Sequence, residues 1–115
     1  LALLRRWNVE LPEASGASRI AIGVMAIGLA PFAEEIFFRG WLFTCIEEEL
    51  SPGRRRWAAP LLGAFAFAAV HPPLSFVPVF LLGLVASVVF ARTRALVPCF
   101  VAHVLHNGIA VLVAV

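Results

Sequence analysis

Residues 30–40, APFAEEIFFRG, place Glu34, Glu35 and Arg39 inside a strongly apolar stretch of the chain. On a helix, Glu35 and Arg39 are four positions apart with the acid first, which is the favourable order for an intrahelical ion pair. Glu34 is rotated by about 100° from Glu35, so one arginine cannot easily neutralise both acids. The spacing therefore predicts one structural pair and one further acid, Glu34, without a local partner.

The chain has three histidines, His71, His103 and His106, and two of them lie in the stretch AHVLHNG. His103 and Asn107 are four positions apart, so a helix projects them from one face. His106 is rotated by about 60° from His103. A single histidine in an apolar helix is more often a hydrogen-bonded core residue than a catalyst. A catalytic role therefore requires that the histidines lie at the same depth in the fold as the other polar residues.

The predicted helices bring four polar residues to a similar depth. Measured from the two arginine-containing loops at 1.5 Å per residue, Glu34, His71 and Asn107 lie about 26, 22 and 20 Å along their helices, and His103 lies one turn shallower. Both loops belong on the same side of a membrane if arginine marks that side. We therefore expect convergent polar groups in an apolar pocket.

A set of one glutamate, two histidines and one asparagine suits an activated water. A glutamate can act as the general base, and histidine and asparagine can donate hydrogen bonds to a developing oxyanion. Alternatively, Glu34 and two histidines could hold zinc, although the H-E-x-x-H pattern is absent. Ser75 and Ser87 have no histidine neighbour in sequence. Cys45 and Cys99 lack metal-ligand spacing and are interpreted as small apolar residues.

The composition indicates that these residues lie in a membrane. The chain has 115 residues, enough for one domain, with 62% hydrophobic and 14% charged residues, against about 45–50% and about 25% in soluble proteins. A soluble domain of this size could not bury so many apolar helices. Arginine clusters flank apolar segments, as membrane anchors do. We expect a lipid bilayer as partner, no nucleic acid, and a multi-pass protein of a prokaryotic plasma membrane.

The elements that position the polar residues are predicted to be helices only. Pro31 should break the first helix or start the second, since proline is tolerated in the first turn of a helix. Pro72 and Pro73 should end the third, since a residue before proline disfavours the helical conformation. The predicted fold is an all-α, polytopic transmembrane bundle of about five segments, at about 18–30, 32–50, 57–71, 74–91 and 95–115. Residues 1–17 are expected to form a juxtamembrane segment, and 18–115 the core of a longer membrane protein.

Three motifs resemble those of a known family. EEIFFR matches E-E-x-x-x-R, FAAVH matches F-x-x-x-H, and HVLHN matches H-x-x-x-N. The chain thus resembles the CAAX protease and bacteriocin-processing enzyme family over residues 18–112. This family includes type II CAAX prenyl endopeptidases and lysostaphin resistance protein A-like proteins. Phe67, which opens the second motif, is interpreted as a packing residue.

The resemblance implies an intramembrane glutamic endopeptidase. By this likeness Glu34 would activate water, His71 would assist it, and His103 and Asn107 would form the oxyanion site. The substrate would be a peptide or a protein C-terminus within the membrane.

The resemblance also implies that Glu35 and Arg39 hold the glutamate-bearing helix in place. It implies no cofactor and no metal, with zinc as the alternative because the family was earlier described as metalloproteases. Two other classes stay open. One is a non-catalytic scaffold or immunity protein with the same fold, and the other is a transporter whose charges line an ion path.

Overall fold

The computed structural model describes residues 16–114, and within them the regular structure is entirely helical. The expected all-α class is confirmed. The first half forms one uninterrupted rod made of α2 (Gly16–Val24), the π-turn η1 (Met25–Leu29), α3 (Ala30–Glu35), the π-helical η2 (Ile36–Phe43) and α4 (Thr44–Glu49). The second half consists of α5 (Pro52–Ala69), the short 3₁₀ turn η3 (Pro73–Ser75), α6 (Phe76–Thr93) and α7 (Leu96–Ala114).

The rod passes through Pro31, so the expected boundary between two helices at this residue is wrong. Pro31 has no N–H and would disrupt a regular α-helix. The π-turn before it absorbs the defect, because the N–H of Ala30 reaches back five residues to the carbonyl of Met25. The first two predicted segments are therefore one helix. Of the expected juxtamembrane segment 1–17, only residues 16 and 17 lie within the described part, where they begin α2.

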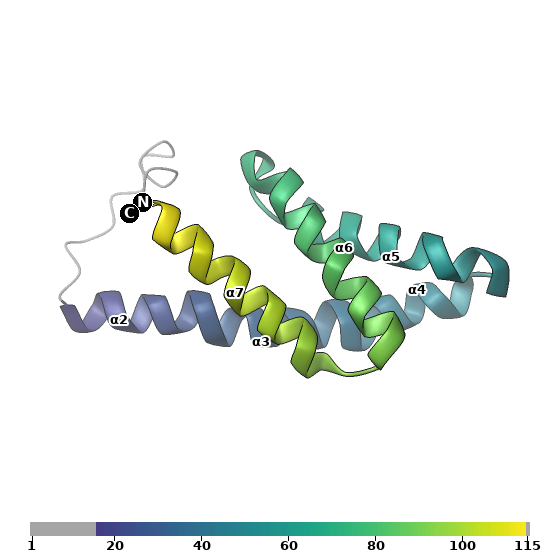
Figure 1. Cartoon of the computed structure of the whole chain (residues 1–115), viewed down its shortest axis with the longest axis horizontal. Helices are drawn as coiled ribbons and strands as arrows, with labels where there is room; N and C mark the ends of the chain where they lie inside the picture. The colour runs from purple at the N-terminus through teal and green to yellow at the C-terminus, as the bar shows by residue number, and fades with distance from the viewer. Residues whose placement is uncertain (1–15, 115) are drawn as a thin grey trace.

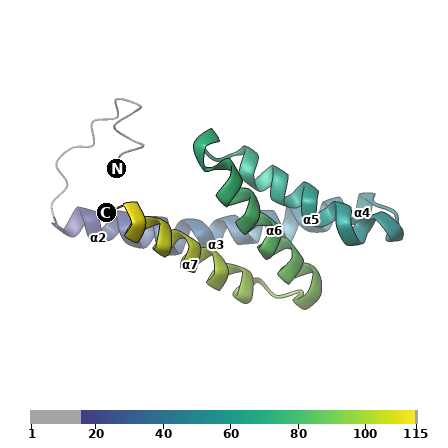
Figure 2. The ribbon, with the colours of Figure 1, turned by 45° about the horizontal axis from the view of Figure 1, so that its top comes forward.

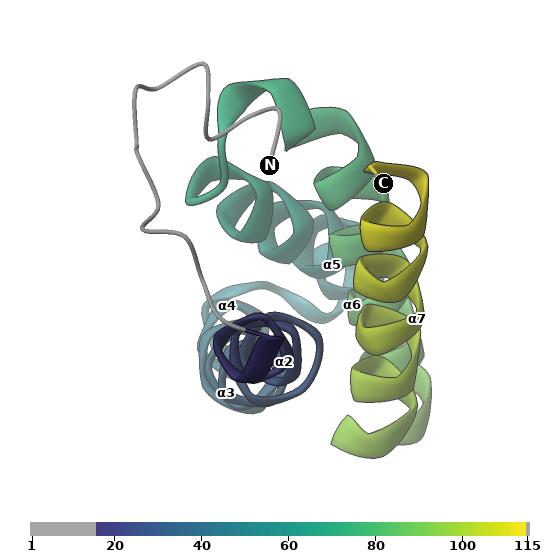
Figure 3. The same ribbon diagram turned by 90° about the vertical axis from the view of Figure 1, so that its left-hand side faces the viewer.

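The other helices pack along one side of the rod. Figure 1 shows the rod along the length of the molecule, with α5 and α6 folded as a hairpin beside it and α7 crossing it obliquely. In the end-on view of Figure 3 the rod is seen down its axis, with α5, α6 and α7 to one side. Figure 2 shows α7 near the α2 and α3 part of the rod, while α5 extends toward α4. The rod thus contacts both the hairpin and α7.

Two apolar clusters form the core, one toward each end of the α5–α6 hairpin. The first contains Phe38, Phe67, Ala68, Val79 and Leu82, and the second contains Phe43, Ala59, Ala86, Phe90 and Cys99. Small residues let the helix backbones approach closely in this contact, as is common between membrane helices.

The outer surface is apolar and fits a bilayer. Large side chains are exposed on the rod, α5, α6 and α7, for example Ile20, Phe65, Leu81 and Leu112. Within residues 16–114, three helices are long and apolar enough to cross a membrane, at Gly16–Glu49, Pro73–Thr93 and Leu96–Val113. The rod has 34 residues, about 51 Å at 1.5 Å per residue, so it exceeds a hydrocarbon layer of about 30 Å. It must tilt or project beyond the layer.

Candidate active site

Glu34 faces two imidazoles that come from other helices. Its Oε2 atom lies 3.6 Å from Nε2 of His103 on α7 and 3.9 Å from Nε2 of His71, just after α5. This oxygen is buried and has no hydrogen-bond partner among the described residues, although the Glu34 side chain as a whole is 33% exposed. Separations above about 3.5 Å suit a bridging water better than a direct hydrogen bond.

The other ring nitrogen of each histidine has an acceptor. Nδ1 of His103 lies 2.8 Å from Oε1 of Glu35, and Nδ1 of His71 lies 2.8 Å from the carbonyl oxygen of Phe67. A carbonyl and an ionised carboxylate only accept hydrogen bonds, so we assign a proton to Nδ1 in both rings. Nε2 of each neutral ring therefore presents a lone pair toward Glu34. When the ring is protonated, Nε2 becomes a donor.

Glu35 and Arg39 form the predicted ion pair, and it is almost fully buried. Nη1 of Arg39 lies 3.1 Å from Oε1 of Glu35, and each side chain is 1% exposed. Nη2 of Arg39 donates to the carbonyl of Gly83 on α6 at 3.2 Å. The same Glu35 oxygen therefore accepts from both Arg39 and His103, and this network ties the rod to α6 and α7.

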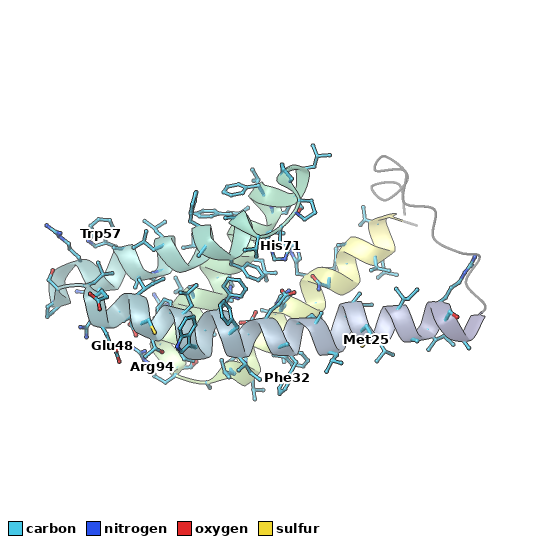
Figure 4. The ribbon with its side chains drawn as sticks, turned by 180° about the vertical axis from the view of Figure 1, so that it is seen from behind. Met25, Phe32, Glu48, Trp57, His71 and Arg94 are labelled. Carbon is cyan, nitrogen blue, oxygen red and sulfur yellow. The ribbon has the colours of Figure 1, made fainter. Side chains whose placement is uncertain are left out.

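The Phe67 ring packs against the side chains of the site. Its fully buried ring lies 4.7 Å from the ring of His71 and 5.4 Å from that of His103, between centroids. The guanidinium carbon of Arg39 lies 4.5 Å from the same centroid, a cation–π distance. The packing role expected for Phe67 is present, and this one ring also limits the positions of three site residues. Figure 4 shows His71 between α5 and α7, away from the α4 end of the molecule.

Asn107 is bound to the rod rather than to the imidazoles. Its Nδ2 atom donates to the carbonyl oxygen of Ala26 at 3.0 Å. In a regular α-helix this carbonyl would accept from Ala30, and in a π-helix from the residue at position 31. Ala30 donates to Met25 instead, and Pro31 has no N–H to donate. The proline thus leaves a carbonyl that Asn107 satisfies.

The structure brings Glu34, His71 and His103 together and places Asn107 one turn further along α7. His106 is half-buried and makes no hydrogen bond or ion pair within the described residues. Sequence reasoning missed two backbone groups, the carbonyls of Ala26 and Gly83. Only a partial signal for the first is present in the sequence: Pro31 has no N–H, but in a regular α-helix this would free the carbonyl of Ile27, and the π-turn shifts the free carbonyl to Ala26.

The described residues include no group of three His, Cys, Asp or Glu side chains arranged to hold a metal ion. One nitrogen of each histidine in the site is used in a hydrogen bond to Glu35 or to Phe67. The atoms that remain free to bind a water or a metal ion are the Glu34 Oε2 atom and the two Nε2 atoms. The steps proposed below use no metal.

Residues 16–109 match the family described as type II CAAX prenyl endopeptidase Rce1-like, which is most of the chain. The chain belongs to this family. The match contains every residue of the site, from Ala26 to Asn107. A member of the type II CAAX prenyl endopeptidase Rce1-like family with three apolar helices of membrane-spanning length is an integral membrane protein of the protease class.

No curated protein and no solved structure matches the chain.

Proposed function

We propose that this protein is an intramembrane endopeptidase in which Glu34 activates the attacking water. One observation carries the proposal: a buried, unpaired Glu34 oxygen faces Nε2 of two histidines from other helices. A water between these three atoms could be held in position for attack, and a carboxylate next to it can accept its proton.

The proposed reaction proceeds in two steps. The water oxygen bonds to the substrate carbonyl carbon, one water proton moves to Glu34, and the carbonyl electron pair moves onto oxygen. The tetrahedral species then collapses, the C–N bond breaks, and Glu34 returns the proton to the leaving amine. His71 helps to orient the water through Nε2, because its Nδ1 proton is used by the Phe67 carbonyl.

The developing oxyanion requires hydrogen-bond donors. His103 can supply one from Nε2 only as the imidazolium, since its other N–H is directed to Glu35. The Glu35 carboxylate accepts the Nδ1 hydrogen bond and holds the ring in this orientation. Asn107 keeps one amide hydrogen for the substrate, because Ala26 accepts only the other. The Glu35–Arg39 pair is proposed to position this arrangement without touching the substrate.

The substrate we propose is a peptide or protein C-terminus in the bilayer, processed in the manner of CAAX proteins, with a prokaryotic plasma membrane as the location. The test uses the full chain in proteoliposomes with a fluorogenic membrane peptide. Glu34→Gln keeps the size of the side chain but removes the base, so turnover should fall at least about 100-fold. The control is Glu48→Gln, an exposed glutamate on α4, which should leave turnover unchanged.

Two outcomes would contradict the proposal. Turnover of Glu34→Gln within a few-fold of the parent would show that Glu34 is not the base. A parent chain that binds membrane peptides but cleaves none, with no new peptide termini in membranes carrying it, would favour a scaffold or immunity protein.

A further inference from the structure

A second polar region lies where α4 meets α5 and α6 ends. A cavity of about 530 Å³ opens here, lined by four arginines and one glutamate among its charged residues. The arginines come from two separate segments, Arg55 and Arg56 in the first turns of α5 and Arg92 and Arg94 at the end of α6. Figure 4 shows Arg94 and Trp57 at the α4 end of the molecule, away from His71. The cavity is thus separate from the candidate active site.

The charges in this cavity are unbalanced. Arg94 forms a two-pronged ion pair with Glu47, at 2.5 and 2.9 Å. Among the described residues, the Arg55 guanidinium donates to the backbone carbonyl of Leu50 and to no carboxylate. In the described part of the chain, no carboxylate pairs with Arg55, Arg56 or Arg92.

The arginines, not the helix ends, supply the attraction for an anion at this cavity. The 18-residue helix α5 begins at Pro52, which lines the cavity, and the 18-residue helix α6 ends beside Arg92, so the positive end of one helix dipole is offset by the negative end of the other. The arginine guanidinium group binds phosphate through parallel hydrogen bonds.

Arg94 has a left-handed backbone, with φ of 53°, where glycine is usual. The Glu47 hydrogen bonds hold the Arg94 side chain in this position and raise the pKa of Arg94 above its ordinary value. The fold therefore keeps a fixed cation at the cavity despite the backbone strain.

The location of the cavity indicates that its anion comes from a membrane lipid. The cavity lies at the ends of two candidate membrane-crossing helices, since α6 ends at Thr93 and α7 begins at Leu96. Trp57 follows Arg56 directly and is 61% exposed, as aromatic residues at a membrane–water interface are. Pro60 and Val88 give the cavity apolar walls. A phospholipid places a phosphate group next to apolar acyl chains at this depth, which matches a cavity with arginines and apolar walls.

We propose that this arginine cavity binds the phosphate group of an anionic phospholipid. Basic pockets between membrane helices are suited to such headgroups. The site would tie the α4–α5 turn and the α6–α7 loop to the bilayer surface, and this inference does not depend on the protease mechanism.

The test is native mass spectrometry of the full chain in detergent, with phosphatidylglycerol or phosphatidylcholine of the same acyl chains added. The double variant Arg56→Gln/Arg92→Gln removes two unpaired cations. At about 1 kcal/mol for each arginine, phosphatidylglycerol binding should weaken about thirtyfold. The matched control Arg54→Gln changes a neighbouring exposed arginine that does not line the cavity and should stay within about twofold. Circular dichroism checks that helicity is retained.

Stronger binding of phosphatidylglycerol than of phosphatidylcholine, lost in the double variant alone, would support the proposal. Equal binding of the two lipids, or an unchanged double variant, would overturn it. In a separate arm, inorganic phosphate at about 10 mM competes with the lipid. If phosphate alone displaces the lipid and binds with the same arginine dependence, the ligand is a soluble anion and the lipid assignment is wrong.

Discussion

Asn107 on α7 donates a hydrogen bond to the carbonyl oxygen of Ala26 on the rod, at 3.0 Å. This bond exists because the rod has a π-turn before Pro31, where neither Ala30 nor Pro31 donates to Ala26. Two segments that are 81 positions apart are thereby joined next to the proposed oxyanion site. A proline that sequence rules treat as a helix end instead creates a binding group for a site residue.

Pro31→Ala is expected to lower kcat while leaving the fold intact. The new N–H can compete with Asn107 for the Ala26 carbonyl and so loosen the amide that we propose to face the oxyanion. A hydrogen bond contributes about 1 kcal/mol, so we expect a loss of about fivefold. Thermal stability should stay equal or rise, because alanine is favoured over proline inside a helix. Steady-state kinetics and thermal unfolding in detergent measure both effects.

A double-mutant comparison separates this effect from a general one. If Pro31 acts through Asn107, adding Pro31→Ala to Asn107→Ala should change kcat no further. Fully additive losses would show that the proline acts elsewhere. Pro78→Ala, at an exposed proline in the first turn of α6, is the matched control and should leave kcat unchanged.

Substitutions at the buried Glu35–Arg39 pair should affect stability and turnover differently. Arg39→Met alone leaves the Glu35 charge without its partner in the core and should cost about 3–5 kcal/mol of unfolding free energy. The double variant Glu35→Leu/Arg39→Met removes both charges and should recover most of this loss. Its turnover should nevertheless stay low, because His103 no longer has an acceptor for its Nδ1 proton. Thermal unfolding and peptide turnover are compared for each variant.

Full activity in the stable double variant would contradict the positioning role of Glu35. The ion pair of Glu47 with Arg94, which are 47 positions apart, provides the control. Replacing both of its members by Gln should leave turnover unchanged, because this pair lies in the arginine cavity and not at the active site.

The sequence predicts those site features that depend on one helix at a time. The Glu35–Arg39 pair follows from a four-residue spacing, and the unpaired state of Glu34 follows from the rotation between adjacent positions. The approach of His71 and His103 to Glu34 follows only roughly from depth, because the final distances depend on how α5, α6 and α7 pack. The Ala26 contact of Asn107 was not predicted, since it depends on a π-turn that no local pattern specifies.

Gly83→Ala should destabilise the contact between α5 and α6. A Cβ atom at this glycine would lie 3.1 Å from the Ala64 Cα and 3.1 Å from a ring carbon of Phe67, so the helices or the ring must shift. Overpacking of this kind costs about 1–3 kcal/mol. The shift would also affect the Arg39 bond to the Gly83 carbonyl and the Phe67 ring, so turnover should fall together with the melting temperature.

Gly23→Ala is the matched control, since a Cβ there meets nothing within 4 Å. It should be neutral or slightly stabilising, because alanine is the better helix former by about 0.5–1 kcal/mol. Equal melting temperatures for Gly83→Ala and the parent would show that the two helices are less tightly packed at Gly83 than the distances indicate.

Removal of metal should leave the activity intact. The proposed reaction uses Glu34 as the base and His103 with Asn107 as hydrogen-bond donors, and none of its steps needs a metal ion. Protein dialysed against EDTA and then 1,10-phenanthroline should therefore keep its turnover, and elemental analysis should find far less than one zinc per chain. A known zinc peptidase treated in parallel checks that the chelation is complete. The prediction fails if chelation abolishes turnover and added zinc restores it in the parent but not in Glu34→Gln. That result would assign Glu34 and the histidines to a zinc centre.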